Sequence, residues 1–108
     1  MVATDATLTT LLDPGRETAE RIAAARRLGS GKQPAAIEAL TRVAQQIAVP
    51  PTLASEVGRT LGYLCFQRAR DVHELDMAMF SDEAGDAYDE EIGRLQRLQP
   101  DVKMRRAV

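Results

Sequence analysis

The stretch PAAIEALTRVAQQI, residues 34–47, decides the fold class of this chain. Its apolar residues recur at intervals of three and four, a spacing that places them on one side of an α-helix. Those residues are Ala36, Ile37, Leu40, Val43, Ala44 and Ile47. Pro34 suits the first turn of a helix, because the N–H that proline lacks would have no partner there. The stretch therefore predicts an amphipathic helix with one buried side.

The same spacing rules, applied outward from this stretch, predict further helices. They fall at residues 5–12, 16–28, 53–70, 72–80 and 82–99. Gly29 is expected to end the second of these in a left-handed conformation, Thr52 to cap the helix that follows Pro50-Pro51, and Ser81 to cap the last. No segment alternates apolar and polar residues with the period of a β-strand. The sequence therefore predicts an all-α fold of five to six helices.

Two glycines stand out inside the predicted helix 53–70. Gly58 and Gly62 lie about one turn apart, and each costs up to about 1 kcal/mol of helix stability relative to alanine. A sequence that accepts this cost twice on one side of a helix indicates that another backbone packs closely there. Cys65 lies in the apolar run beside them and is expected to fill space in the core.

Length and composition indicate one domain over residues 1–108, with a frayed basic tail at 101–108. Cys65 is the only cysteine, so an intrachain disulfide is impossible, and the N-terminus lacks the pattern of a secretory signal. These features favour a cytoplasmic location. The apolar run at 61–66 is far shorter than the roughly 20 residues that cross a bilayer, so no membrane association is expected.

A weak internal repeat appears when the chain is shifted by 33 residues. The segment ARRLG at 25–29 then aligns with GRTLG at 58–62, so that a small residue, Arg, any residue, Leu and Gly recur in order. Repeats of 20 to 50 residues are typical of helical solenoids. With these motifs and the apolar segment 34–40, residues 16–80 resemble HEAT-like helical repeat proteins.

The resemblance implies a right-handed stack of antiparallel helical hairpins. Helix 16–28 would pair with helix 34–47, and helix 53–70 with helix 72–80. Arg70 stands where the 33-residue offset would place an apolar residue of the second unit. A compact helical bundle is therefore the alternative architecture.

Charge is strongly segregated along the chain, although the net charge is only −2. Residues 71–91 contain nine acidic side chains and no lysine or arginine, whereas the segments before and after carry net charges of +3 and +4. A segment of this kind creates a field that speeds association with a cationic surface. A solvated helix face with no binding role is the other interpretation of the same pattern.

The acidic segment predicts a small protein-binding domain, an adaptor or an immunity-type inhibitor, rather than an enzyme. Its partner would be a protein with a basic surface, such as a nuclease toxin. Arginine is much preferred over lysine, which is typical of a high-GC bacterial genome. The predicted partner-binding residues are Asp71, Glu74, Asp76, Asp82, Glu83, Asp86, Asp89 and Glu90.

A small enzyme or metal-binding protein is the alternative function. His73 stands three residues before Asp76, and it could work with nearby carboxylates such as Glu74 and Asp86. Along a continuous helix, however, Cys65 and His73 would lie roughly 12 Å apart, too far to act as a nucleophile and base. No metal ligand set is assigned on this basis.

Other chemical motifs are incomplete. The segment GSGKQ at 29–33 lacks the first glycine and the Ser or Thr of a phosphate-binding loop, and residues 82–91 lack the oxygen spacing of a calcium loop. Neither a nucleotide nor another cofactor is therefore predicted. The arginines of helix 16–28 are expected to be solvated and to point in several directions, which together with a pI near 5.4 argues against nucleic acid as the partner.

Overall fold

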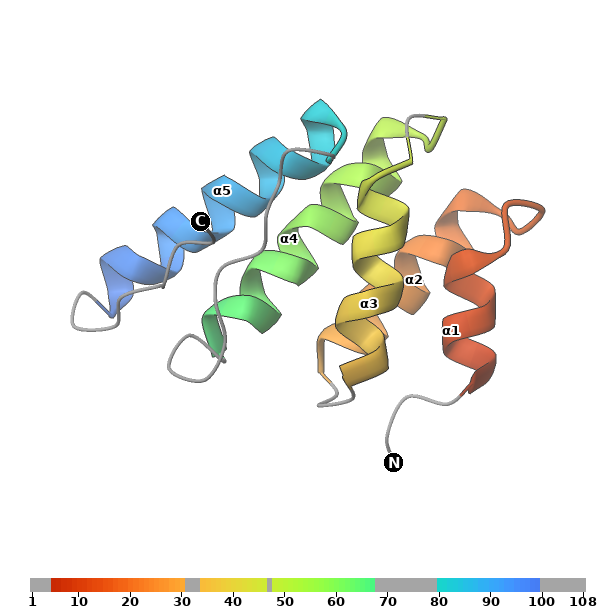
Figure 1. Ribbon diagram of the computed structural model, residues 1–108, viewed down its shortest axis with the longest axis horizontal. Helices are drawn as coiled ribbons and strands as arrows, with labels where there is room; N and C mark the ends of the chain where they lie inside the picture. Colours follow the sequence, from red (N-terminus) through yellow and green to blue (C-terminus); the bar gives the residue numbers. More distant parts are fainter. Residues whose placement is uncertain (1–4, 31–33, 47, 68–79, 100–108) are drawn as a thin grey trace.

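The computed structural model describes residues 5–30, 34–46, 48–67 and 80–99, and every regular element there is an α-helix (Figure 1). The helices are α1 (Asp5–Leu12), α2 (Thr18–Gly29), α3 (Pro34–Ala44), α4 (Pro51–Gln67) and α5 (Asp82–Leu98). The prediction of an all-α fold is confirmed for this part of the chain. The Cα radius of gyration is 13.1 Å, close to the ~13 Å of a compact domain of 100 residues.

The five helices form two groups that run in opposite directions. Figure 1 shows α2, α4 and α5 side by side with the same chain direction, while α1 and α3 run the other way. Helix α4 lies at the centre, since it packs most extensively against α5 and also contacts α2 and α3. Helix α1 contacts both α2 and α3. The hydrophobic core lies between the two groups.

The packing order differs from the hairpins that the repeat pattern predicts. Helix α3 packs mainly against α4 and α1, and its contact with α2, the predicted partner, is much smaller. The second predicted hairpin needs helix 72–80, which lies outside the described residues apart from Phe80. The HEAT-like stack therefore stays a prediction, whereas the compact all-α arrangement is observed.

Helix α2 ends differently from the prediction. Gly29 is its last residue and does not have a positive φ, so the left-handed conformation expected there is wrong. The helix closes through Ser30, whose N–H and hydroxyl both donate to the carbonyl oxygen of Arg27, at 3.3 and 2.9 Å. An added Cβ at Gly29 would lie 3.0 Å from Cγ2 of Thr60. The missing side chain thus serves the approach of α4.

Of the two predicted N-caps, Thr52 for α4 and Ser81 for α5, the structure confirms only Ser81. Helix α4 begins at Pro51, so Thr52 lies within its first turn and does not cap it. The hydroxyl of Ser81 accepts from the N–H of Ala84 at 3.4 Å, which confirms the predicted cap of α5. The N–H of Ser81 also donates to the carbonyl oxygen of Ala44 at 2.8 Å. This bond fixes the start of α5 to the end of α3.

Large side chains from all five helices fill the core. The largest that are fully buried include Leu11, Leu28, Leu40, Leu61 and Tyr88. The ring of Tyr88 meets that of Phe80 edge to face, with centroids 6.0 Å apart. Cys65 is 1% exposed, which confirms that it fills space in the core.

The two glycines of α4 lie where α5 comes closest. An added Cβ at Gly58 would overlap the backbone carbonyl of Ala84, and one at Gly62 would lie 3.0 Å from the carbonyl oxygen of Tyr88. A step of four residues along α4 thus matches a step of four residues along α5 in the same direction, as two parallel helices require. The prediction that another backbone packs against this glycine pair is confirmed, and the partner is α5.

Candidate functional site

Helix α5 carries the part of the predicted binding surface that the structure describes. Asp71, Glu74 and Asp76 lie outside the described residues. The other five predicted residues are exposed, and together they are named the acidic face. They are Asp82, Glu83, Asp86, Asp89 and Glu90.

The helical repeat of α5 places these carboxylates on one side. Positions spaced by three and four residues share a side of an α-helix, and the acidic face follows this spacing from the first turn onward. Its opposite side packs into the core through Ala84, Tyr88, Ile92 and Leu95. The apolar spacing of helix 82–99 predicts that these four residues and Leu98 face inward, which is confirmed for the four and wrong for Leu98, which is 67% exposed. Two of the carboxylates also stand in the first turn, where the helix dipole stabilises negative charge.

No residue of the acidic face forms an ion pair with another described residue. The five carboxylates span about 12 Å of helix axis, because each residue adds ~1.5 Å. Five negative charges at this density, none of them in an ion pair with a described residue, give this side of α5 a local negative potential. Such a face attracts cationic groups and repels anionic ones.

Glu91 belongs to the acidic segment in sequence but not to the acidic face. Its side chain is 9% exposed and packs against α4, where an added Cβ at Gly62 would lie 3.1 Å from its own Cβ. Both carboxylate oxygens accept from Arg94, at 2.9 and 2.8 Å. These hydrogen bonds lower the pKa of Glu91, burial opposes the shift, and the charges of Arg94 and Arg59 reinforce it. The ion pair lies within α5, since Arg94 is 52% exposed on the same helix, and only the Glu91 side chain reaches α4.

The lowered pKa of Glu91 predicts a pH dependence of stability. A carboxyl whose folded pKa lies below its unfolded pKa stabilises the fold at pH values above the unfolded pKa, near 4.5 here. That contribution is lost as the pH falls through the folded pKa. We expect Glu91→Gln to lower the free energy of unfolding at pH 7, and the difference from the parent to shrink below about pH 4.

Urea unfolding curves at pH 7, 5 and 3 test this expectation, with Glu38→Gln as the control. Glu38 is an exposed carboxylate whose ion pair with Arg42 on α3 is 3.7 Å long, so its loss should matter little at any pH. A Glu91→Gln difference that stays constant from pH 7 to pH 3 would show that packing, and not charge, makes the contribution.

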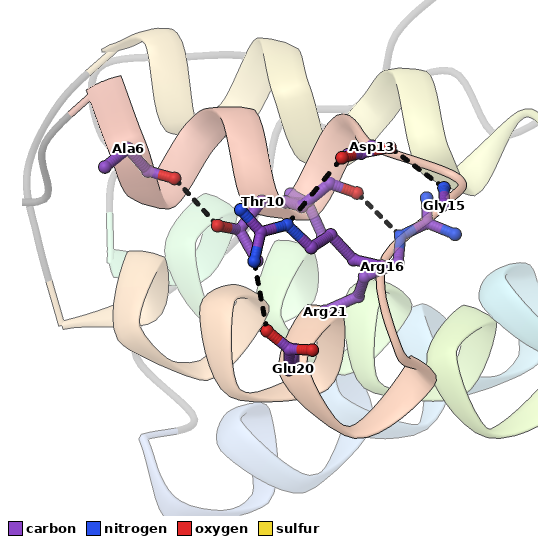
Figure 2. Close-up of polar contacts among 8 residues, drawn as sticks. Ala6, Thr10, Asp13, Gly15, Arg16, Glu20 and Arg21 are labelled. Carbon is purple, nitrogen blue, oxygen red and sulfur yellow. Dashed lines mark hydrogen bonds and ion pairs between the residues drawn. The ribbon is translucent and has the colours of Figure 1, made fainter.

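The arginines of the predicted helix 16–28 divide into exposed and buried groups, and Arg16 lies just before the observed start of α2. Arg16 pairs with Glu20 at 3.3 Å, as the expectation of solvated, charge-balancing arginines requires. Arg21 contradicts that expectation, since it is 5% exposed and its Nε–H donates to the carbonyl oxygen of Leu11 at 2.9 Å (Figure 2). Burial lowers the pKa of Arg21, and the nearby charge of Asp13 opposes the shift. Arg21 therefore ties α2 to the end of α1.

A second charged arrangement crosses α2 and α4, and the sequence analysis did not identify it. Oε1 of Glu56 lies 3.3 Å from Nη2 of Arg26 and 3.3 Å from Nη1 of Arg59. The two arginines belong to the repeated motif, but their shared carboxylate comes from outside it. Only the position of Glu56, three residues before Arg59 in a helical pattern, was a visible signal.

The residues of the enzymatic alternative are mostly outside the described part of the chain. His73 and Glu74 lie in the segment 68–79, and Asp86 is one of the exposed carboxylates of α5. Lys32 and Gln33 of the incomplete phosphate loop also lie outside it. Among the described residues, no group of three or more His, Cys, Asp and Glu could hold a metal ion.

The described helices also differ from membrane spans. None of them combines the length and the apolar character that crossing a bilayer requires. No protein-family model, curated protein or solved structure matches this chain.

Proposed function

We propose that this chain is a small protein-binding domain, an adaptor or an immunity-type inhibitor, that docks a basic partner protein through the acidic face of α5. The observation that carries the proposal is the exposure of five carboxylates on one side of α5, without an ion pair to any other described residue. Asp71, Glu74 and Asp76 extend the same charge in sequence and belong to the proposal.

Electrostatics supports a fast, salt-sensitive association. Charges that face water keep their hydration in the unbound domain, so the acidic face is maintained without the desolvation cost of buried ions. Opposite charges on a partner increase the association rate, and salt screens this effect with a Debye length of about 8 Å at physiological ionic strength. A nuclease, whose substrate site must be cationic, is one class of partner that such a face would cover.

The position of the carboxylates favours binding over catalysis. An acid–base enzyme needs carboxyl groups that converge in a concave site. Among the surface grooves of the described residues, one lies between α1 and α2 and another between α2 and α4. Neither is lined by a residue of the acidic face. The acidic face instead extends along the exposed side of α5, where all five carboxylates face solvent.

Reversing Glu83, Asp86 and Glu90 to lysine tests the proposal. The three side chains are exposed, so the variant should fold with little change in melting temperature. We expect it to lose at least about tenfold in affinity for a fluorescein-labelled octalysine peptide, together with most of the salt dependence. Fluorescence anisotropy at 20 and 200 mM salt gives both quantities. The parent protein and the variant are then each immobilised and exposed to a host lysate, and the proteins that only the parent captures are identified.

A second triple variant separates the local face from the net charge. Glu17 at the N-cap of α2, Glu20 on α2 and Glu38 on α3 are all exposed. Changing these three to lysine alters the net charge by the same amount, from −2 to +4. This control should weaken octalysine binding much less than the α5 variant. Equal losses in the two folded variants would mean that net charge alone attracts the peptide, and the acidic face would then have no specific role.

A further inference from the structure

A groove between α2 and α4 carries a charge opposite to that of the acidic face. Its volume is about 360 Å³, at the lower end of the range for small binding sites. Figure 1 shows the two helices side by side, with α5 on the other side of α4. Ile22 and Pro51 give the groove an apolar part, and Thr52 and Ser55 add hydroxyl groups. Arg26 and Arg59 supply its positive charge.

Glu56 holds the two guanidinium groups near each other. Its Oε1 is 3.3 Å from one nitrogen of each arginine, so at most about 6.6 Å separates these two nitrogens. The Glu56 side chain is only 12% exposed, while Arg26 and Arg59 are 68% and 55% exposed. The carboxylate therefore lies beneath the guanidinium groups and leaves their outer sides open to solvent. Because the two guanidinium groups are already held near each other, less conformational entropy is lost when a ligand binds them.

The remaining hydrogen-bond donors define what can bind. Each guanidinium carries five N–H donors, and the contacts with Glu56 engage one nitrogen of each arginine. The other donors of Arg26 and Arg59 have the planar arrangement that fits a carboxylate in a two-pronged contact. Two arginines and one glutamate leave a net charge of +1, which a single carboxylate neutralises.

We propose that this groove binds a carboxylate side chain within an acidic peptide segment of a partner protein. Ile22 and Pro51 match the aliphatic part of such a side chain, and the hydroxyls of Thr52 and Ser55 can bond the peptide backbone. A phosphate dianion fits less well, because Glu56 would repel its second charge. The inference does not depend on the proposed function, because it uses residues of a different surface.

The test is a nuclear magnetic resonance titration with a hexaglutamate peptide, alongside a hexaglutamine peptide of the same length. We expect hexaglutamate to shift the amide resonances of Ile22, Ser55 and Arg59, and hexaglutamine to leave them unchanged. The double variant Arg26→Gln, Arg59→Gln should lose at least about tenfold in affinity, because charge-assisted hydrogen bonds disappear. The variant Arg42→Gln removes an exposed arginine of α3 outside the groove, and it should bind like the parent.

A charge-removing variant at Glu56 adds a readout that general loss of folding would not produce. In Glu56→Gln the amide oxygen still accepts from Arg59, while the net charge of the groove rises from +1 to +2. Hexaglutamate should therefore bind several-fold more tightly. Binding that the arginine double variant leaves intact, or equal binding of the two peptides, would overturn the proposal. Preferential binding of inorganic phosphate over hexaglutamate would overturn the assignment to an acidic peptide.

Discussion

Gly58→Ala is expected to lower the free energy of unfolding by roughly 2 to 3 kcal/mol, although it adds only one methyl group. The new Cβ would overlap the backbone carbonyl of Ala84, whose carbon would lie 2.8 Å away. A backbone atom cannot rotate aside as a side chain can, so α5 must move away from α4 along their most extensive contact. The higher helix propensity of alanine offsets at most about 1 kcal/mol of this loss. Urea unfolding followed by circular dichroism at 222 nm measures the difference.

Gly93→Ala is the matched control for this prediction. Gly93 lies on α5, and the nearest atom to an added Cβ there is Nη1 of Arg97, at 3.6 Å. That distance is an ordinary van der Waals contact with the end of a flexible side chain. The substitution should stabilise the protein by up to about 1 kcal/mol through helix propensity alone. Similar losses in the two variants would contradict the close approach of α4 and α5.

The glycine pair illustrates what the sequence could predict about packing. Gly58 and Gly62 indicated a close backbone neighbour, because helical glycine is costly unless the space is used. The identity of that neighbour was not predictable, since Ala84 and Tyr88 lie 26 residues further along the chain. Helical periodicity fixes which side of a helix is buried, but it carries no information about which other helix covers that side.

The partner of each helix was not predictable for the same reason. Apolar spacing gave the position of each described helix to within a few residues, and the 33-residue repeat correctly placed equivalent motifs on α2 and α4. Consecutive helices were then assumed to be partners. In the structure α2 contacts α4 far more than α3, so the repeated motifs mark two parallel neighbours. A local pattern cannot decide between these packings, because either one buries the same apolar residues.

The candidate site was predictable where it follows helical spacing. Glu83, Asp86 and Glu90 are exposed as predicted, because they lie opposite the apolar side of α5. The groove was missed because its charged residues come from two helices. Glu56 contacts Arg26 only because α4 packs on α2. The two residues are thirty positions apart, so no local sequence pattern predicts this contact. The sequence thus identifies surfaces made by one helix more readily than those made by two.

Leu40→Ala is the second substitution with a large expected effect. Leu40 is fully buried on α3, the helix that the sequence defines most clearly. Removing its outer carbons loses apolar burial and leaves a cavity among α1, α3 and α4, whose backbones cannot collapse fully into the space. We expect the free energy of unfolding to fall by about 2 to 5 kcal/mol, the range for buried leucines. For a domain of this size, each 1 kcal/mol corresponds to a fall of roughly 4 to 8 °C in melting temperature.

Leu98→Ala provides the same chemical change at an exposed position. Leu98 ends α5 and is 67% exposed, so its truncation leaves no cavity and should alter stability by no more than about 0.5 kcal/mol. The difference between the two leucine variants therefore isolates the contribution of burial and packing at Leu40. If Leu40→Ala also changed stability by less than about 1 kcal/mol, α3 would have to lie outside the core, and the packing of α1 and α4 around it would be wrong.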